Sequence, residues 1–254
     1  MSTTPWLSDC GRPYVRNTPY FFDVESIPAV KEVERNFEVI RDELLRSLQV
    51  EESPFEPYGD LTKTDRKQAW KTAGLMYWSL RSKPNIQRFP ETWKIMRRIP
   101  NLSACSLLLL EPRSTIKPHI GDTDAMYRCH MGLVVPAGLP QCGFRCGDES
   151  RPWVAGRVFA FNDACEHTAW NNTQERRFIL SFDILRPQFE GTKYWTSANV
   201  LGKIYLEILE QHAPIMERLG KIRWLRSAMF ALSKAWWHAR VRWHAIAFSD
   251  PIRD

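Results

Sequence analysis

Between residues 103 and 186, short apolar segments alternate with turn-forming residues, and this pattern constrains the fold more than any other feature of the chain. Each segment has the length of a strand of roughly five to eight residues. The segments are SACSLLLLEP, AMYRCHMGLVVP, CGFRCG, GRVFAFND and RRFILSFDIL, with Pro, Gly, Asp and Asn residues between them. Short strands at this spacing favour a β-sandwich or a barrel-like roll over alternating strands and helices.

Helical patterns flank this strand-rich region. Residues 28–49 (PAVKEVERNFEVIRDELLRSLQ) carry apolar side chains every three or four positions, which predicts an amphipathic helix. Residues 89–100 predict a short helix, because prolines stand in its first turn and just past its end. Residues 69–80 predict a strand pair or a buried strand. Residues 1–25 have no period and predict an extended arm on the core, whereas the chain beyond Tyr194 predicts helix.

A chain of 254 residues with 44% hydrophobic residues is long enough to bury one sizeable core. We therefore expect a single domain with three parts. Residues 1–102 form an arm and helices that pack on the core, and residues 103–190 form the β core. Residues 191–254 form a helical, basic and tryptophan-rich segment.

The positive charge of the chain is concentrated near its C-terminus. The formal net charge is +6, and residues 221–242 hold six Lys and Arg residues without an acid, so the rest of the chain is neutral. Three interpretations of residues 219–248 are open: a helix packed on the roll with solvated cations, a helix on an anionic membrane surface, or a docking site for a carrier protein or an acidic peptide. No recognised nucleic-acid-binding motif accompanies the charge, so we expect no nucleic-acid partner.

Targeting and redox features favour a cytoplasmic protein, with peripheral contact at the inner membrane surface as an option. The N-terminus lacks the basic start and the apolar stretch of a signal peptide, and no apolar run reaches the roughly 18 residues of a membrane span. Of six cysteines, Cys142 and Cys146 form a lone CxxxC pair, with no second pair to complete a zinc site. We expect reduced thiols, because reducing compartments such as the cytosol disfavour disulfides.

Two histidines of the strand region are candidates for a metal site. His119 follows one predicted strand, and His167 follows another 48 residues further on. A double-stranded β-helix, which is a jelly-roll or cupin-like fold, brings such distant strand ends together at its mouth. An imidazole pair with open coordination positions is the protein part of a non-haem iron site, which normally adds one carboxylate. Spacing alone does not separate this hypothesis from two structural histidines.

An arginine near the second histidine indicates an anionic ligand. Arg177 stands in the apolar run RRFILSF, ten residues after His167. A buried guanidinium needs an anion, and a dicarboxylate would supply one. Arg128 and His130 share one face of their strand and would suit the other end of that anion. The alternative for Arg177 is a place on the solvated face of its strand.

Residues 104–187, about a third of the chain, resemble the catalytic core of the aspartyl/asparaginyl β-hydroxylase family. The resemblance rests on PHxGxT at 118–123, RxHxGLVxP at 128–136, WxxGxxxxFxD at 153–163, EHxxWN at 166–171, and then Arg177. Weaker similarity reaches back through VERNFEVIRDELL and FPETWKIM. The resemblance implies a double-stranded β-helix enzyme that uses iron(II), 2-oxoglutarate and O2 to hydroxylate an unactivated carbon.

The same resemblance assigns roles to single residues. His119 and His167 resemble the two iron ligands of the family. Arg177 resembles the arginine that pairs with the distal carboxylate of 2-oxoglutarate. Arg128 and His130 resemble the pair that contacts the carboxylate nearer the metal.

Two positions bear on the ligand set. Gly121 stands where many related oxygenases place an aspartate ligand, although the family itself also has glycine there, with solvent completing the coordination. Asp122 or water would then fill the third position, and Asp122 is one residue out of register. Leu108 stands where the family has a serine that helps to hold the distal carboxylate, and Ser106, on the same strand face, is the substitute we expect.

The family resemblance also limits the substrate. It implies hydroxylation at the β-carbon of an Asp- or Asn-type residue in a peptide, a protein or an amino-acid-derived natural product. Hydroxylation of a lipid acyl chain, of the lipid A type, is one alternative. The other is a non-catalytic β-roll that binds a metal or 2-oxoglutarate. The residues that grip the substrate in animal members have no clear match, and the oligomeric state stays open.

Overall fold

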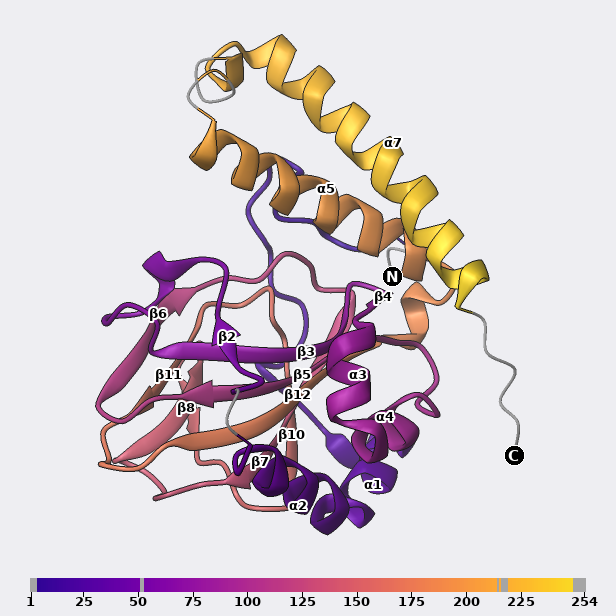
Figure 1. Cartoon of the computed structure of the whole chain (residues 1–254). Helices are drawn as coiled ribbons and strands as arrows, with labels where there is room; N and C mark the ends of the chain where they lie inside the picture. The colour runs from indigo at the N-terminus through magenta and orange to yellow at the C-terminus, as the bar shows by residue number, and fades with distance from the viewer. Residues whose placement is uncertain (1–3, 51–52, 214, 216–218, 249–254) are drawn as a thin grey trace.

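Two antiparallel sheets with helices outside them form the body of the protein (Figure 1). The computed structural model describes residues 4–50, 53–213, 215 and 219–248. The larger sheet has the order β1 (Phe21–Phe22), β10 (Val158–Phe161), β7 (Met126–Val134), β12 (Arg177–Leu185), β5 (Leu102–Leu110), β3 (Trp70–Tyr77) and β2 (Glu56–Pro57), and β4 (Leu80–Arg81) pairs with β3. The smaller sheet has the order β6 (Ser114–His119), β11 (His167–Asn171), β8 (Cys142–Cys146) and β9 (Glu149–Arg151).

The chain passes back and forth between the two sheets. Strands β5, β7, β10 and β12 belong to the larger sheet, and β6, β8, β9 and β11 to the smaller one. Every pairing between these strands is antiparallel. This alternation makes a double-stranded β-helix, so the predicted fold class is confirmed.

Side-chain alternation gives the larger sheet one face for helices and one for a cavity. On β12, Leu180 and Phe182 pack in the core beneath the helices, whereas Arg177 and Ser181 line a cavity between the sheets. Successive residues of a strand point to opposite faces, so every second residue of β12 reaches the cavity. Strands β5 and β7 repeat this division.

Four helices cover the outer face of the larger sheet (Figure 1). They are α1 (Pro28–Arg35), α2 (Phe37–Ser47), α3 (Lys83–Arg88) and α4 (Pro90–Met96). The single helix predicted over 28–49 is divided at Asn36, whose Nδ2 donates to the Glu32 carbonyl at 2.8 Å. Val33 and Ile40 are nonetheless both buried, so the apolar stripe continues across the break. Helix α4 confirms the short helix predicted in 89–100, and α3 was not predicted.

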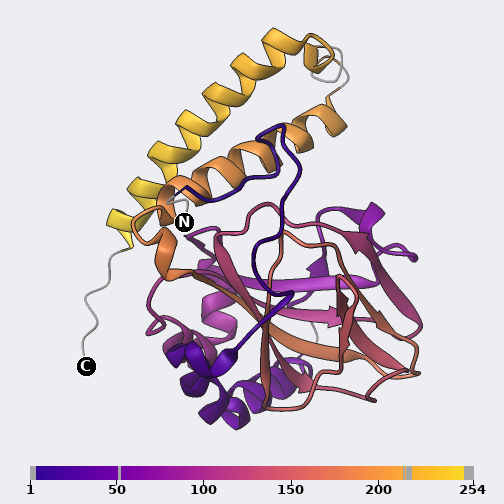
Figure 2. The same ribbon diagram turned by 180° about the vertical axis from the view of Figure 1, so that it is seen from behind.

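The remaining N-terminal elements are short. The predicted strand pair or buried strand over 69–80 is β3 followed by β4. The described arm before β1 runs from the C-terminal helices along the roll (Figure 2). The short 3-10 helices are η1 (Val24–Ser26), η2 (Leu61–Lys63) and η3 (Pro187–Phe189). Strand β1 extends the larger sheet beside β10, and two residues are too few to show a period in the sequence.

Two long helices stand beside the roll as an antiparallel hairpin (Figures 1 and 2). They are α5 (Lys193–His212) and α7 (Arg223–Ala247). Leu201 and Val241 join them to a core cluster that includes Trp78 and Leu185 of the roll. None of the helices formed by the described residues combines the length and the apolarity needed to cross a lipid bilayer. The six cysteines are free thiols.

Candidate functional site

The pairing of two strands of the smaller sheet brings the two predicted metal ligands together. His119 is the last residue of β6 and His167 the first of β11, and they are partners in the strand register. Their ring centroids lie 4.3 Å apart, with 58° between the ring planes. The 48-residue separation in the chain is thus closed by one antiparallel pairing.

Backbone carbonyls fix the orientation of both imidazoles. His119 Nδ1 lies 2.7 Å from the Lys117 carbonyl oxygen, and His167 Nδ1 lies 2.9 Å from that of Cys165. A carbonyl oxygen only accepts, so in each ring Nδ1 carries the hydrogen and Nε2 keeps its lone pair. Burial lowers the pKa of His119, and it holds the pKa of His167 well below its ordinary value. Both rings are therefore neutral near pH 7 and present Nε2 as metal-binding atoms.

The place beside this pair where related oxygenases carry an aspartate has no side chain, because it is Gly121. A Cβ at Gly121 would lie only 1.7 Å from Asp163 Oδ2, so the Asp163 carboxylate fills that space. Asp163 Oδ1 accepts from Arg128 Nη1 at 2.6 Å and lies 3.5 Å from His167 Nε2. Within the described part of the chain, no group of three His, Cys, Asp or Glu side chains is arranged to hold a metal ion.

Asp122, the other candidate for a third ligand, is engaged elsewhere. Its Oδ1 accepts from Lys203 Nζ of α5 at 2.8 Å and from Ser8 Oγ of the N-terminal arm at 3.1 Å. The carboxylate of Asp122 thus ties the loop after β6 to the helical hairpin.

Arg177 is a buried cation, and its guanidinium pairs with no carboxylate of the described residues. Arg177 is the first residue of β12 and is only 1% exposed. Nε and Nη1 have no hydrogen-bond partner among the described residues, and the guanidinium carbon lies 4.4 Å from the centroid of the Trp153 ring. Burial lowers the pKa of Arg177 to about 10, so the group still carries its charge at neutral pH. An unpaired buried charge lowers the stability of the folded protein considerably unless an anion binds to it.

His130 and two serines line the same cavity as Arg177. His130 Nδ1 is buried without a partner, and its ring stacks on Trp153 with centroids 6.3 Å apart. Ser181 of β12 is the register partner of both Ser106 and His130, so these three residues form a row across β5, β12 and β7. The row adds neutral hydrogen-bonding groups to the cavity that Arg177 lines.

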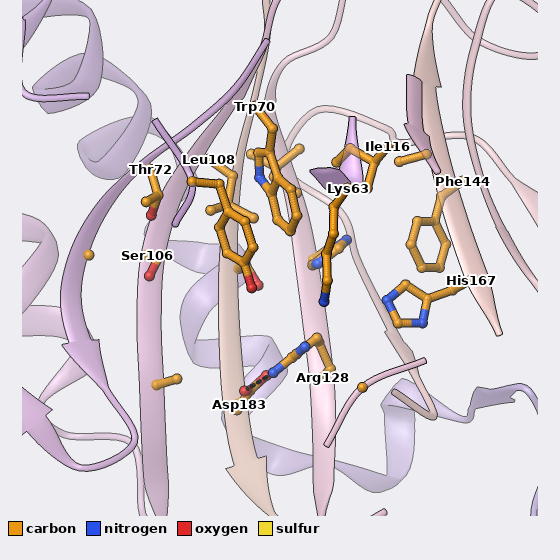
Figure 3. A pocket seen from close by; sticks show the side chains of 18 of the residues that line it. Lys63, Trp70, Thr72, Ser106, Leu108, Ile116, Arg128, Phe144, His167 and Asp183 are labelled. Carbon is orange, nitrogen blue, oxygen red and sulfur yellow. Dashed lines mark hydrogen bonds and ion pairs between the residues drawn. The ribbon is translucent and has the colours of Figure 1, made fainter. Parts of the chain in front are cut away.

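Arg128 is held in place by two aspartates. Nε and Nη2 donate to the two carboxylate oxygens of Asp183 at 2.8 and 2.7 Å, and Nη1 donates to Asp163. Figure 3 shows the pairing with Asp183 at the floor of the cavity. The two carboxylates balance the charge of Arg128, which distinguishes it from the unpaired Arg177.

These side chains, with the exception of Asp163, line one cavity of about 330 Å³. The six residues that the sequence predicts for the site all line it: Ser106, His119, Arg128, His130, His167 and Arg177. Its apolar wall includes Trp70, Leu108, Ile116 and Phe144 (Figure 3).

Three polar residues that line the cavity, Lys63, Tyr58 and Ser181, are not among the predicted site residues. Lys63 projects into the cavity from η2 (Figure 3), and Tyr58 stacks on Trp70 at 3.7 Å between centroids. Both stand in a segment that carries no strand or helix period. Ser181 has a signal that would have found it, since it lies four residues after Arg177 on the same face of β12.

The chain is similar to a known family of hydroxylases. The family model described as "Aspartyl/Asparaginyl beta-hydroxylase" matches residues 34–187. The "Ornithine lipid ester-linked acyl 2-hydroxylase" of Rhizobium tropici is 30% identical over 208 residues, which are 79% of this chain and 73% of the relative. The human "Aspartyl/asparaginyl beta-hydroxylase" is 29% identical over 164 residues, which are 63% of this chain but only 21% of the human protein.

Solved structures with similar architecture are more distant. A prolyl-4-hydroxylase of Pseudomonas putida has a TM-score of 0.39 and 14% identity, covering 63% of this chain and 88% of that one. A predicted oxalate decarboxylase of Thermotoga maritima has a TM-score of 0.36 and 16% identity, covering 56% and 97%.

Proposed function

This chain belongs to the aspartyl/asparaginyl β-hydroxylase family, and we propose that it is an iron(II)- and 2-oxoglutarate-dependent hydroxylase. The observation that carries the proposal is the buried, anion-free guanidinium of Arg177 in the cavity of the paired histidines. A metal-binding pair and an anion-binding cation in one cavity are what a cosubstrate needs if it is to bind a metal at one end and an arginine at the other.

His119 and His167 fit the requirements of an iron(II) site. Each offers a neutral Nε2, because its Nδ1 hydrogen is donated to a backbone carbonyl. Because Gly121 supplies no ligand side chain, the two histidines as protein ligands would leave positions for cosubstrate, O2 and water. The Asp163 carboxylate occupies the space beside Gly121. Asp163, next to His167 Nε2 and bonded to Arg128, would accept a hydrogen bond from a metal-bound water.

Arg177 and its neighbours fit 2-oxoglutarate. Its two unpartnered nitrogens would donate to the distal carboxylate, and Ser106 and Ser181 line the same cavity. His130, whose Nδ1 is also unpartnered, packs against Trp153, which contacts Arg177, and against Phe161, which contacts His167. Arg128, fixed by its two aspartates, would offer the remaining N–H hydrogens of Nη1 and Nη2 to the other carboxylate without moving.

The chemistry follows from this binding arrangement. Bound iron(II) with 2-oxoglutarate and O2 supplies an oxidation in which one oxygen atom enters a substrate C–H bond and the other enters succinate, with release of carbon dioxide. The chain holds the reactants and excludes water: Trp70, Phe144 and Trp153 wall the cavity, and no side chain is required as a general base.

The names of the relatives indicate the kind of carbon that is attacked. C2 of an ester-linked acyl chain is next to the ester carbonyl, and the β-carbon of aspartate is next to the side-chain carboxyl. We infer that the substrate of this protein presents a methylene group next to a carbonyl. An Asp- or Asn-type residue, the substrate that the family resemblance implies, is the first candidate.

An acyl chain of a polar lipid is the second candidate, and two observations support it. The first is the similarity to the lipid hydroxylase of Rhizobium tropici, which extends over 79% of this chain. The second is the apolar part of the cavity wall, formed by Leu108, Ile116, Phe144 and Ile179, which suits a hydrocarbon better than a second charged group.

The test is turnover with both candidates. Protein loaded with iron(II) is incubated with 2-oxoglutarate and air, together with an aspartyl peptide or an ester-linked acyl lipid. We expect succinate and, with one of the substrates, a product that carries one added oxygen atom by mass spectrometry. His119→Ala and His167→Ala should abolish both. An iron-loaded protein that forms no succinate with or without either substrate would contradict the proposal.

A further inference from the structure

Helix α7 uses one face to pack on α5. Val241 is fully buried, and Ser233 Oγ donates to the Gly202 carbonyl of α5 at 3.0 Å. Arg226 Nε donates to Glu210 Oε1 of α5 at 2.8 Å. These contacts define the inner face of α7 and identify the opposite face as the outer one.

The outer face of α7 carries a stripe of exposed apolar side chains. Trp224 is 72% exposed, Leu232 72%, Trp243 59% and Ile246 76%. At 3.6 residues per turn these four positions fall within a sector about 100° wide, opposite Val241. The exposed alanines in the same sector are Ala228, Ala235 and Ala239. An apolar stripe this long on a surface helix marks an interaction site.

The charge of α7 indicates the kind of partner. The helix has five cations and no acid. The cations are Arg223, Arg226, Lys234, Arg240 and Arg242. At 100° per residue, Arg240 and Arg242 flank the apolar stripe on either side, so a partner that complements them is anionic. Arg223 and Lys234 lie on the side of Val241, where Lys234 packs against Gly202 of α5. Arg226 is neutralised within the hairpin by Glu210.

Arg240 lies next to two exposed tryptophans of α7, one of which belongs to the apolar stripe. Its guanidinium lies 5.7 Å from the Trp236 ring centroid and 5.8 Å from that of Trp243. A tryptophan with an arginine beside it presents an apolar body and a cationic tip, which is the arrangement that suits the boundary between lipid headgroups and acyl chains. A helix with an apolar stripe and flanking arginines lies in the plane of that boundary.

We propose that the outer face of α7 binds the surface of an anionic phospholipid bilayer, with Trp224, Leu232, Trp243 and Ile246 entering the headgroup region and with Arg240 and Arg242 contacting lipid phosphates. This proposal stands on the geometry and charge of α7 and does not depend on the hydroxylase function. The hairpin is also fixed to the roll beside the cavity, because Lys203 of α5 pairs with Asp122, which lines the cavity. Membrane binding would therefore hold the cavity at a defined place relative to the lipid surface.

The experiment is co-sedimentation of the full chain with vesicles, without iron or substrate. Vesicles of phosphatidylcholine alone are compared with vesicles that also contain phosphatidylglycerol. We expect binding to the anionic vesicles that is roughly tenfold or more tighter than to the neutral ones and that weakens with added salt.

Two double variants separate the apolar and the charged contributions. Leu232→Ser with Trp243→Ser, and Arg240→Gln with Arg242→Gln, should each weaken binding by roughly tenfold while circular dichroism stays unchanged. Leu45→Ser, at an exposed position of α2, is the matched control and should bind like the wild type.

Two results would overturn the proposal. One is wild-type binding to anionic vesicles that is no tighter than that of the Leu232/Trp243 variant. The other is a concentration-dependent dimer of the wild type that the same variant abolishes, since the stripe would then be an interface between two copies of the chain.

Discussion

Replacing Arg177 by methionine should stabilise the protein while it destroys the cosubstrate site. The pKa of Arg177 is held at about 10 instead of 12.5 because the charge is buried, which corresponds to a cost of about 3 kcal/mol for the charged form. The contact with Trp153 returns about 1–2 kcal/mol of that cost. Because the folded pKa lies below the ordinary value, the cost is present at every pH below about 10 and declines only above it.

Arg177→Met keeps an unbranched side chain of about the length of the arginine's aliphatic stem and removes the charge. The free energy of unfolding of the metal-free protein should rise by about 1–2 kcal/mol, because an apolar side chain suits the site better than an unpaired cation. For a chain of this size the melting temperature would increase by about 2–8 °C. Addition of manganese(II), as a redox-inert substitute for iron, and 2-oxoglutarate should stabilise the wild type further but leave the variant unchanged.

The assay is thermal denaturation of both proteins, without ligand and with manganese(II) plus 2-oxoglutarate. Arg176→Met is the matched control, because Arg176 is the preceding residue but is exposed and paired with Glu111 at 3.0 Å. It should keep the response to 2-oxoglutarate. The reasoning is refuted if Arg177→Met lowers the ligand-free stability by several kcal/mol, or if that variant still responds to 2-oxoglutarate.

Two further predictions concern the histidine pair and its surroundings. Gly121→Ala places a Cβ 1.7 Å from Asp163 Oδ2 and should lower the free energy of unfolding, measured by urea denaturation, by about 1–3 kcal/mol. Gly138→Ala is the control, because a Cβ there meets no atom within 4 Å, and it should change the free energy of unfolding little. Equal effects of the two substitutions would contradict this prediction. Burial holds the pKa values of His130 and His167 well below 6.5, so the unfolded chain binds more protons below pH 6.5 and the metal-free protein loses stability as the pH falls. His130→Gln should reduce that pH slope by about 1.4 kcal/mol per pH unit, and an unchanged slope would show that His130 is not buried in its neutral form.

The β-roll could be predicted because its strands are short and apolar and end at clear turn residues. The run RRFILSFDIL became β12, with alternate residues facing helices and cavity as a period of two requires. The helix over 28–49 was predicted as one piece, since its apolar stripe does not change phase at Asn36. The break depends on a local hydrogen bond to Glu32, which periodicity does not report.

The candidate site was predictable to the extent that its residues lie on strands or in motifs. His119 and His167 meet because β6 and β11 pair, and the motif set already placed both at strand ends. Lys63 and Tyr58 come from a segment without a period, and their place in the cavity depends on long-range packing against Trp70.

The sequence alone also could not predict which charged side chains pair with one another. Arg128 and Arg177 both belong to apolar strands, yet Arg128 meets Asp163 and Asp183 whereas Arg177 meets no carboxylate of the described chain. The register of β7, β12 and the loop before β11 decides this difference, and only the folded structure reveals it.

The most direct test of the account is the visible metal-to-ligand charge-transfer band of the oxygen-free protein with iron(II) and 2-oxoglutarate. We predict a band in the wild type that is lost in His119→Ala and in His167→Ala, and that requires a much higher 2-oxoglutarate concentration in Arg177→Met. The intact protein giving no band under these conditions, with no bound iron found by metal analysis, would contradict the assignment of this cavity as an iron and 2-oxoglutarate site.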